Sequence, residues 1–409
     1  MALVEKLFPL KSYKEITSEW LQKMLTVNYG HKIFIKSWNL KQPEDRQGFL
    51  SEICYVTVNY EYQNHENMCN YTENDKKSLQ MDPKAKHEAW QNEELRLFVK
   101  FFPETKIHID FMVNAKLADK EVAFYMFSIS KIFQDISRSI GALQIVPKIY
   151  YADCKDESLT IVQEDLSDQG FKTILNREGS TLQQTKVALK SIAIIHAIGL
   201  IYKNKKGKLP HLKKFDIEFV QKFLEPNTIT LAQYLEGSPL SGKIKELAPI
   251  ANQLLLKAKR ISDGFLETVC HGDLWMGQLM FPANEDCACV LDWQFANIGN
   301  PIQDIMALLF MSGNMEILET HLTQILQTYW ETLIDTLQKG ETTIDISFEV
   351  FLQTVERLWL LGFIFLTASL HDFLGADYIS DQRLRAAYNF LNNRKLFDNI
   401  LKEVDDTIP

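Results

Sequence analysis

The sequence of 409 residues contains no apolar run long enough to cross a bilayer. Its longest apolar stretch, residues 358–370, is shorter than the roughly 18 residues that a transmembrane helix needs, and Gly362 interrupts it. We therefore expect a buried core helix there and no membrane span. Residues 1–4 are apolar, but Glu5 and Lys6 follow directly, so the start does not resemble a secretory signal and we expect a cytosolic location.

Basic residues are also fewer than acidic ones, with 44 Lys and Arg against 53 Asp and Glu. A formal net charge of −9 is the opposite of what binding to a phosphate backbone requires, so nucleic acid is not expected as a partner. Contents of 46% hydrophobic and 24% charged residues are ordinary for a globular protein and indicate neither disorder nor a fibrous architecture.

The six cysteines are scattered along the chain, mostly inside apolar runs where a thiol behaves as a small hydrophobic group. No disulfide framework is indicated. Cys287 and Cys289 stand close together but lack a second pair at the spacing of zinc ligands, so no zinc site is expected.

What the sequence does contain is a pair of acidic residues, each at the end of an apolar stretch. Asp273 follows His-Gly and precedes Leu-Trp, and Asp292 precedes Trp-Gln. Between them, residues 279–281 and 287–291 have the pattern of two short strands joined by a polar turn, and such a hairpin brings both acidic residues to the same end. Either aspartate alone is equally well explained as a turn or strand-end residue. Together they offer one carboxylate to accept a proton from a substrate hydroxyl and one to hold Mg²⁺ against a nucleotide.

Alternation and helical periodicity divide the rest of the chain into a sheet-rich first part and a helical second part. A polar stretch over residues 63–92 has little periodicity and indicates a surface insertion. Strands are predicted over residues 33–40, 51–62, 95–101, 148–151 and 159–162, and helices over residues 17–25, 119–136, 181–202, 215–223 and 244–260.

This order predicts an α+β fold with two lobes, which is the layout of kinases. Residues 1–165 are expected to form the N-terminal nucleotide-binding lobe, with an antiparallel sheet, one main helix and the insertion at about 63–92. Residues 166–409 are expected to form a larger, mainly helical lobe for catalysis and substrate binding.

A nucleotide site also needs a cation for the α and β phosphates, which kinases supply with a Lys on the third strand and a Glu on the following helix. Lys100 and Glu121 stand in these places. Alone, Lys100 is also explained as a solvated strand residue, and Glu121 as a carboxylate favourable to the first turn of a helix. The loop that covers the phosphates is expected between the first two strands, where Gly48 and Ser51 are the small residues.

The segment Glu164-Asp165-Leu166 stands where the sheet-rich part ends. The backbone at Glu164 and Leu166 is placed to bind the edge of an adenine. An ordinary polar linker would have the same sequence, so this prediction depends on position alone.

Several segments together resemble one family. They are Glu121 with Tyr125, residues 164–166, His196 with Ala197, residues 271–275, residues 292–294, and residues 299–301 with Asp304. In these segments the chain resembles the choline-kinase-like and ecdysteroid-kinase-like (CHK kinase-like) proteins of the protein-kinase-like superfamily. The loop around Asp273 is also similar to that of the aminoglycoside phosphotransferases, and the resemblance covers nearly the whole chain.

The resemblance implies ATP-dependent phosphorylation of a hydroxyl on a small molecule such as a steroid, a choline-like compound or another alcohol. It implies that Asp273 orients and deprotonates the acceptor and that Asp292 binds Mg²⁺. It also implies that Lys100 holds the phosphates and that Glu121 positions Lys100.

Gln278 departs from the family, which usually has Asn at this position as a ligand of Mg²⁺. Its amide oxygen keeps the chemistry of a ligand beside Asp292 but sits one methylene farther out, and the geometry of Mg²⁺ is strict. The leading hypothesis is an active small-molecule kinase, and the alternative is a weakly active or inactive pseudokinase that binds a nucleotide or another ligand. A protein kinase is disfavoured because Gly272 replaces the usual Arg and Trp293-Gln294 replaces Phe-Gly.

Asp304 and His271 are expected to support the catalytic loop through hydrogen bonds rather than to touch substrate. Four aromatic residues suit either an acceptor site or the core. They are Trp275, Trp293, Trp359 and Phe363.

Overall fold

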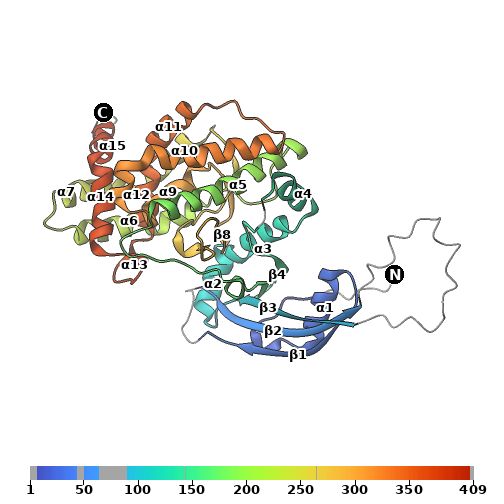
Figure 1. The fold of residues 1–409 in the computed structure, drawn as a ribbon. Helices are drawn as coiled ribbons and strands as arrows, with labels where there is room; N and C mark the ends of the chain where they lie inside the picture. Colours follow the sequence, from blue (N-terminus) through green and yellow to red (C-terminus); the bar gives the residue numbers. More distant parts are fainter. Residues whose placement is uncertain (1–6, 44–49, 64–89, 143, 264, 406–409) are drawn as a thin grey trace, which may run out of the picture. The chain divides into compact units, whose positions relative to one another are not determined.

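The computed structural model describes residues 7–43, 50–63, 90–142, 144–263 and 265–405 (Figure 1). The chain divides into two compact units. Unit 1 comprises Met1–Ala118 and Lys148–Asp168, and unit 2 comprises Asp119–Pro147 and Gln169–Pro409. The expected α+β fold is confirmed, because unit 1 is built on an antiparallel sheet and unit 2 is mainly helical.

Unit 1 is a five-stranded antiparallel sheet in the order β1-β2-β3-β5-β4 (Figure 1). Its strands are β1 (Ile33–Lys41), β2 (Glu52–Gln63), β3 (Trp90–Phe101), β4 (Ile149–Lys155) and β5 (Ser158–Glu164). Its helical elements are η1 (Tyr13–Glu15), α1 (Ser18–Tyr29), α2 (Lys106–Asn114) and η4 (Leu166–Gln169), the last of which reaches the boundary with unit 2. All five predicted strands are therefore present.

The core of unit 1 lies between the sheet and α1. The hydroxyl of Thr17 caps α1 by accepting the backbone N–H of Trp20, as the sequence predicted. Apolar residues of α1 and of alternate strand positions form one buried cluster, because successive side chains of a strand point to opposite faces. Its fully buried members include Leu21, Leu25, Cys54, Val56, Val58, Leu97 and Val162.

Unit 2 is organised around the long buried helix α5 (Leu182–Lys206), which packs against α10 (Met315–Lys339) and β6 (Thr268–Cys270) (Figure 1). Three short strands and one 3-10 turn complete the region of the acidic motifs: β7 (Leu279–Met280), β8 (Cys289–Val290), β9 (Asn297–Gly299) and η6 (Met276–Gln278). The other helices are α3 (Leu117–Ser128), α4 (Lys131–Ile140), α6 (Ile217–Tyr234), α7 (Pro239–Leu247), η5 (Ala248–Ile250), α8 (Ala251–Ser262), α9 (Ile302–Ser312), α11 (Phe348–Arg357), α12 (Trp359–Ala368), α13 (Leu370–Phe373), α14 (Asp381–Asn393) and α15 (Leu396–Asp405).

Two predicted helices are each divided in the structure. The helix expected over 119–136 breaks after Ser128, because the hydroxyls of Ser128 and Ser130 bond to backbone carbonyls and Ser130 caps the N-terminus of α4. The helix expected over 244–260 is split between α7 and α8, since Pro249 cannot continue the backbone ladder of α7.

The polar stretch predicted over 63–92 is too wide at both ends. Gln63 ends β2 and pairs with Trp90, the first residue of β3. Strand pairing uses backbone groups, so the polar residues at the exposed start of β3 do not prevent it. Residues 64–89 lie outside the described residues.

Within the described ranges, α5 is the one single helix whose length and composition would allow it to span a membrane. The pair α11 and α12 meets the same criterion only when the two helices, bent relative to each other, are counted as one span. In the most apolar window of α5, 78% of the residues are buried inside the protein, as in a core helix. The buried core helix expected within residues 358–370 is confirmed by α12, whose apolar side chains are buried.

Candidate active site

The loop that carries Asp273 starts where β6 ends, and β6 is held by antiparallel pairing with β9. Gly272 follows with a φ of 84°, a left-handed conformation that disfavours side chains. A Cβ at this position would lie 2.4 Å from the carbonyl oxygen of Phe295 and 2.7 Å from Nδ2 of Asn297. This position therefore requires glycine, which gives a physical reason for the absence of the arginine found in protein kinases.

Asp304 is fully buried near the start of α9, and its side-chain carboxylate binds backbone N–H groups of the loop. Its Oδ2 accepts the backbone N–H of His271 at 2.7 Å, and its Oδ1 accepts that of Gly272 at 2.8 Å. Nε2 of His196, on α5, lies 3.0 Å from the same Oδ2. The supporting role predicted for Asp304 is confirmed.

His271 connects the loop to the second acidic motif. Its Nδ1 accepts the backbone N–H of Asp273 at 3.2 Å, so its Nε2 carries the proton and donates to the carbonyl of Leu291 at 2.8 Å. Burial lowers the pKa of His271, which favours this neutral form. The imidazole is a structural bridge between the backbone of Asp273 and that of Leu291, and His271 thus makes hydrogen bonds within the loop region, as predicted.

The two acidic motifs converge on Gln278, at the end of η6. Its Nε2 donates to Oδ2 of Asp292 at 3.3 Å and lies 3.5 Å from Oδ2 of Asp273. The predicted hairpin produces this arrangement, because β7 pairs antiparallel with β8 and the N–H of Leu291 donates to the carbonyl of Gln278 at 2.8 Å. Asp292 adopts a φ of 55°, a left-handed conformation that Asp tolerates better than most residues.

Negative charge is concentrated at this point. Burial, followed by the charge of Asp292, raises the pKa of Asp273 from its ordinary 3.8 to about 8, against a smaller lowering by the hydrogen bond from Gln278. The carboxylates of Asp372 and Asp304 raise it further. Two facing carboxylates in a partly buried site attract a proton or a cation between them.

The Asp-Trp-Gln segment is anchored on α3. The ring of Trp293, fully buried, stacks on Phe124 with ring centroids 3.5 Å apart and planes 7° apart. The next residue, Tyr125, makes a hydrogen bond with the backbone of Asp292, and burial raises the pKa of its hydroxyl well above the ordinary value. Sequence reasoning did not identify Phe124, because a buried aromatic on an amphipathic helix has no distinguishing pattern.

The residues predicted to bind the nucleotide triphosphate lie on different units. In unit 1, Lys100 is buried on the face of β3 opposite the core, in register with Ile53 and Ile161. Ser51 is half-buried just before β2, and Gly48 lies outside the described residues. In unit 2, Glu121 is buried on α3, and its pairing with Lys100 stays a prediction.

The segment predicted to bind adenine ends β5. The N–H of Glu164 donates to the carbonyl of Lys148 at 2.9 Å, and that of Asp165 to the carbonyl of Arg96 at 3.1 Å. Leu166 opens η4, a position whose N–H has no acceptor within the helix. The backbone of Leu166 is therefore the better donor of the two predicted residues.

Of the four aromatic residues considered for the acceptor, three belong to the core. Trp293 and Phe363 are fully buried, and Trp359 is 7% exposed. Trp275 is half-buried beside Asp273, and its ring packs against Tyr378 with centroids 5.3 Å apart.

Asp372 and Tyr378 complete this side of the site. The hydroxyl of Tyr378 donates to the backbone carbonyl of Asp372, and the charge of Asp372 acts on Asp273. Neither residue was predicted, because they follow the two aspartates by 80 positions or more and stand in a segment without any signature.

A second cluster of possible metal ligands is already satisfied by protein groups. Ligand atoms of His196, Cys270 and Asp304 lie within 4.8 Å of one another, all buried. Both oxygens of Asp304 accept hydrogen bonds, and Nδ1 of His196 is 2.8 Å from the hydroxyl of Tyr329. This cluster joins α5, α9 and α10 to the catalytic loop.

The model of the ecdysteroid kinase-like family matches residues 47–341, which include both acidic motifs and all of the predicted site residues. The chain belongs to the ecdysteroid kinase-like family. It is a small-molecule kinase, as the sequence motifs predicted. A comparison of this sequence with curated protein sequences found no match.

Solved structures that are similar to this chain include three small-molecule kinases. An ethanolamine kinase of Plasmodium vivax is 12% identical, with 95% of this chain and 93% of that chain covered and a TM-score of 0.40. The choline kinase LicA of Streptococcus pneumoniae is 14% identical, with coverage of 92% and 99% and a TM-score of 0.37. An aminoglycoside phosphotransferase of Streptomyces rimosus, solved with ADP and streptomycin, is 13% identical, with coverage of 66% and 86% and a TM-score of 0.36.

Proposed function

We propose that this family member transfers the γ-phosphoryl group of ATP to a hydroxyl of a small molecule, with Asp273 as the residue that orients the hydroxyl and accepts its proton. The proposal rests on the convergence of Asp273 and Asp292 on Gln278, within 3.5 Å and 3.3 Å. Phosphoryl transfer needs one carboxylate at the nucleophile and one at the metal, and this pair meets that requirement.

Asp292 and Gln278 are the residues proposed to hold Mg²⁺. The donor set fits the ion, because carboxylate and amide oxygens are hard ligands and the crowding of negative charge around Asp273 favours a cation there. The amide of Gln278 has to turn its oxygen toward the metal, which a rotation of the terminal amide achieves. When bound, the ion supplies positive charge that neutralises the phosphates.

The remaining nucleotide contacts are assigned on the family pattern and on local position. Lys100 is proposed to hold the α and β phosphates with Glu121 orienting its ammonium group. Backbone groups of Glu164 and Leu166 are proposed to bind the adenine edge. Ser51, with Gly48, is proposed to belong to the loop over the phosphates.

Asp273 can orient the substrate hydroxyl and accept its proton when that hydroxyl lies within hydrogen-bond reach of the carboxylate. Its N–H is held by His271, and the loop behind it is held by Asp304, so the side chain is positioned before the acceptor binds. Such positioning supplies much of the rate in phosphoryl transfer, since little covalent chemistry falls to the protein.

The acceptor is proposed to lie against Trp275 and Tyr378, the half-buried rings beside Asp273. Aromatic faces suit a flat steroid, and together with the carboxylate of Asp372 they also suit a choline-like cation. Asp372→Asn separates the two classes. The KM of a cationic acceptor should rise about tenfold or more in this variant, whereas the KM of an uncharged steroid should change little.

The decisive experiment is the phosphorylation of a panel of steroids, amino alcohols and other alcohols with ATP and Mg²⁺, with the product identified by mass spectrometry. Asp273→Ala should lower turnover by about 10² to 10⁴-fold while ATP binding is retained. Asp286→Ala is the matched control, because Asp286 is an exposed carboxylate in the turn of the same hairpin and bonds to Asn284. Full turnover in Asp273→Ala would contradict the mechanism.

A nucleotide-binding protein with weak or no turnover is the second candidate. One observation favours it: the Gln278 amide presents its N–H groups, rather than its oxygen, to both carboxylates. If this candidate holds, the chain binds ATP but phosphorylates no member of the panel, and Gln278→Asn restores activity.

A further inference from the structure

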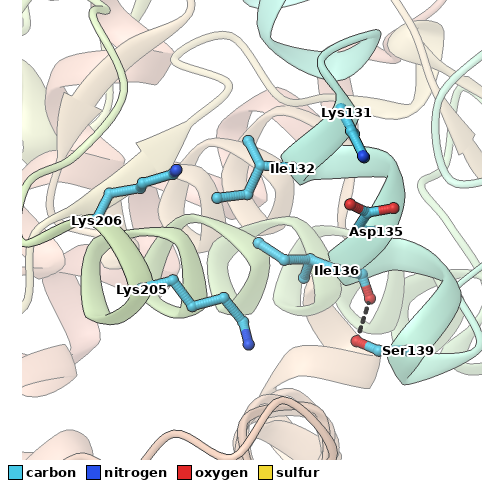
Figure 2. Close-up of a pocket in the computed structure, with 7 residues that line it drawn as sticks. All are labelled: Lys131, Ile132, Asp135, Ile136, Ser139, Lys205 and Lys206. Atoms are coloured by element: carbon cyan, nitrogen blue, oxygen red, sulfur yellow. Dashed lines mark hydrogen bonds between the residues drawn. The ribbon is translucent and has the colours of Figure 1, made fainter.

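A cavity of about 660 Å³ opens on unit 2 between α4 and the C-terminal end of α5 (Figure 2). Its volume is in the range that holds a small molecule or a lipid headgroup. Lysines of both helices and two isoleucines of α4 line it (Figure 2). The residues that line it are Lys131, Ile132, Asp135, Ile136, Ser139, Lys205 and Lys206.

The cavity is cationic on a protein whose formal net charge is −9. Lys131, Lys205 and Lys206 contribute three positive charges, and the one carboxylate, Asp135, is paired with Arg138 at 2.6 Å. Lys131 is the first residue of α4, where a positive charge is unfavourable to the helix dipole, so helix stability does not explain it.

The positive charge continues along the chain beyond the cavity. Lys203 and Lys208 flank the two lysines of α5, and all four are exposed within six consecutive residues. A cluster of four to eight basic residues on a surface is the pattern that attracts anionic phospholipids.

Apolar groups accompany this charge. Ile132 and Ile136 line the cavity, with Ile136 buried and Ile132 half-buried. Ile129, two residues before Lys131 in the chain, is 41% exposed. Apolar side chains beside lysines are typical of proteins that bind at a membrane surface.

We propose that this cavity binds the headgroup of an anionic phospholipid and docks the protein on the surface of an anionic bilayer. Lys131, Lys205 and Lys206 contact the phosphate and its neighbours, while Ile132 contacts the apolar part of the lipid. Ile129 enters the interface between headgroups and acyl chains. This site is separate from the two aspartates, so its test does not depend on the proposed kinase reaction.

Sedimentation of the full-length protein with vesicles tests the proposal. The wild type should sediment with vesicles of phosphatidylcholine mixed with phosphatidylserine and not with phosphatidylcholine alone. Lys205→Gln/Lys206→Gln should weaken binding by about tenfold to thirtyfold, because each lysine near an anionic surface contributes on the order of 1 kcal/mol. Ile132→Ser should weaken it by a smaller factor at the same net charge.

The matched control is Lys190→Gln/Lys402→Gln, which removes the same charge from two exposed lysines that do not line the cavity. Thermal melting should match the wild type in all of these variants. Three results would overturn the proposal: equal sedimentation with both kinds of vesicle, an equal loss in the control variant, or binding of free glycerol phosphate without binding of vesicles.

Discussion

The side-chain amide of Gln278 donates a hydrogen bond to Oδ2 of Asp292 at 3.3 Å, across the base of the hairpin formed by β7 and β8. The same nitrogen lies 3.5 Å from Asp273. A glutamine at this position therefore connects the two aspartates, and a shorter asparagine would not reach as far.

Gln278→Asn is expected to change turnover by less than about tenfold if the native site is already active, and to alter the Mg²⁺ concentration needed for half-maximal rate, since the ligand is displaced by one methylene. Turnover measured against Mg²⁺ concentration checks this. Gln327→Asn is the control, because Gln327 makes the same kind of side-chain bond on the exposed face of α10. A gain of more than about a hundredfold would mean that the native protein is a weak enzyme.

The stability of the metal-free protein should depend on pH through Asp273. Its pKa is about 8 in the folded protein and 3.8 ordinarily, so the folded state binds more protons than the unfolded state between these values. The free energy of unfolding should therefore fall as pH rises from about 4 to about 8.

This pH dependence is measured by denaturant unfolding in a chelator between about pH 5 and about pH 8. Asp273→Asn should unfold with a visibly weaker pH dependence, because the variant has no carboxyl group to titrate. Adding Mg²⁺ should stabilise the wild type more than the variant at the upper end of this range. Parallel pH profiles for the two proteins would show that Asp273 is not the group responsible.

Asp304→Asn should destabilise the protein by about 2–3 kcal/mol and lower turnover, because an amide cannot accept the bonds that both carboxylate oxygens now accept. Chemical denaturation and initial rates measure the two effects. Asp335→Asn removes an exposed carboxylate paired with Lys339 at 2.7 Å, and it should cost less than about 1 kcal/mol. Equal costs for the two variants would remove the argument for Asp304 as the support of the loop.

Gly272→Ala should abolish most turnover, because the new Cβ would meet the carbonyl oxygen of Phe295 at 2.4 Å and displace Asp273. Gly207→Ala is the control for backbone strain alone. Gly207 has a similar φ of 70°, but no atom lies within 4 Å of an added Cβ. The control should lose about 1–2 kcal/mol of stability and keep its activity, and an active Gly272→Ala would disprove the steric account.

Several features of this protein follow from the sequence alone, because they depend on local patterns. Alternation of apolar residues located β2 and β3, short apolar runs beside turns located the other three strands of unit 1, and the turn between residues 281 and 287 located the hairpin. The side-chain types of the acidic motifs indicated a kinase of small molecules, which the family match confirms.

Local patterns were less reliable at element ends. The serines at 128 and 130 have helical neighbours, and only their bonds to backbone carbonyls end α3 and begin α4. The start of β3 is polar, and only its pairing with β2 makes it a strand. Propensity is a weak signal where tertiary pairing or side-chain bonding competes with it.

Only the tertiary structure decided which residues support and surround the two aspartates. Phe124 stacks under Trp293, and Asp372 and Tyr378 lie beside Asp273, although the sequence separates each from its partner by 99 positions or more. Such contacts form because packing brings distant helices together, and no local pattern records them. The sequence determined the chemistry of the acidic pair, and packing determined what holds that pair in place and what faces it.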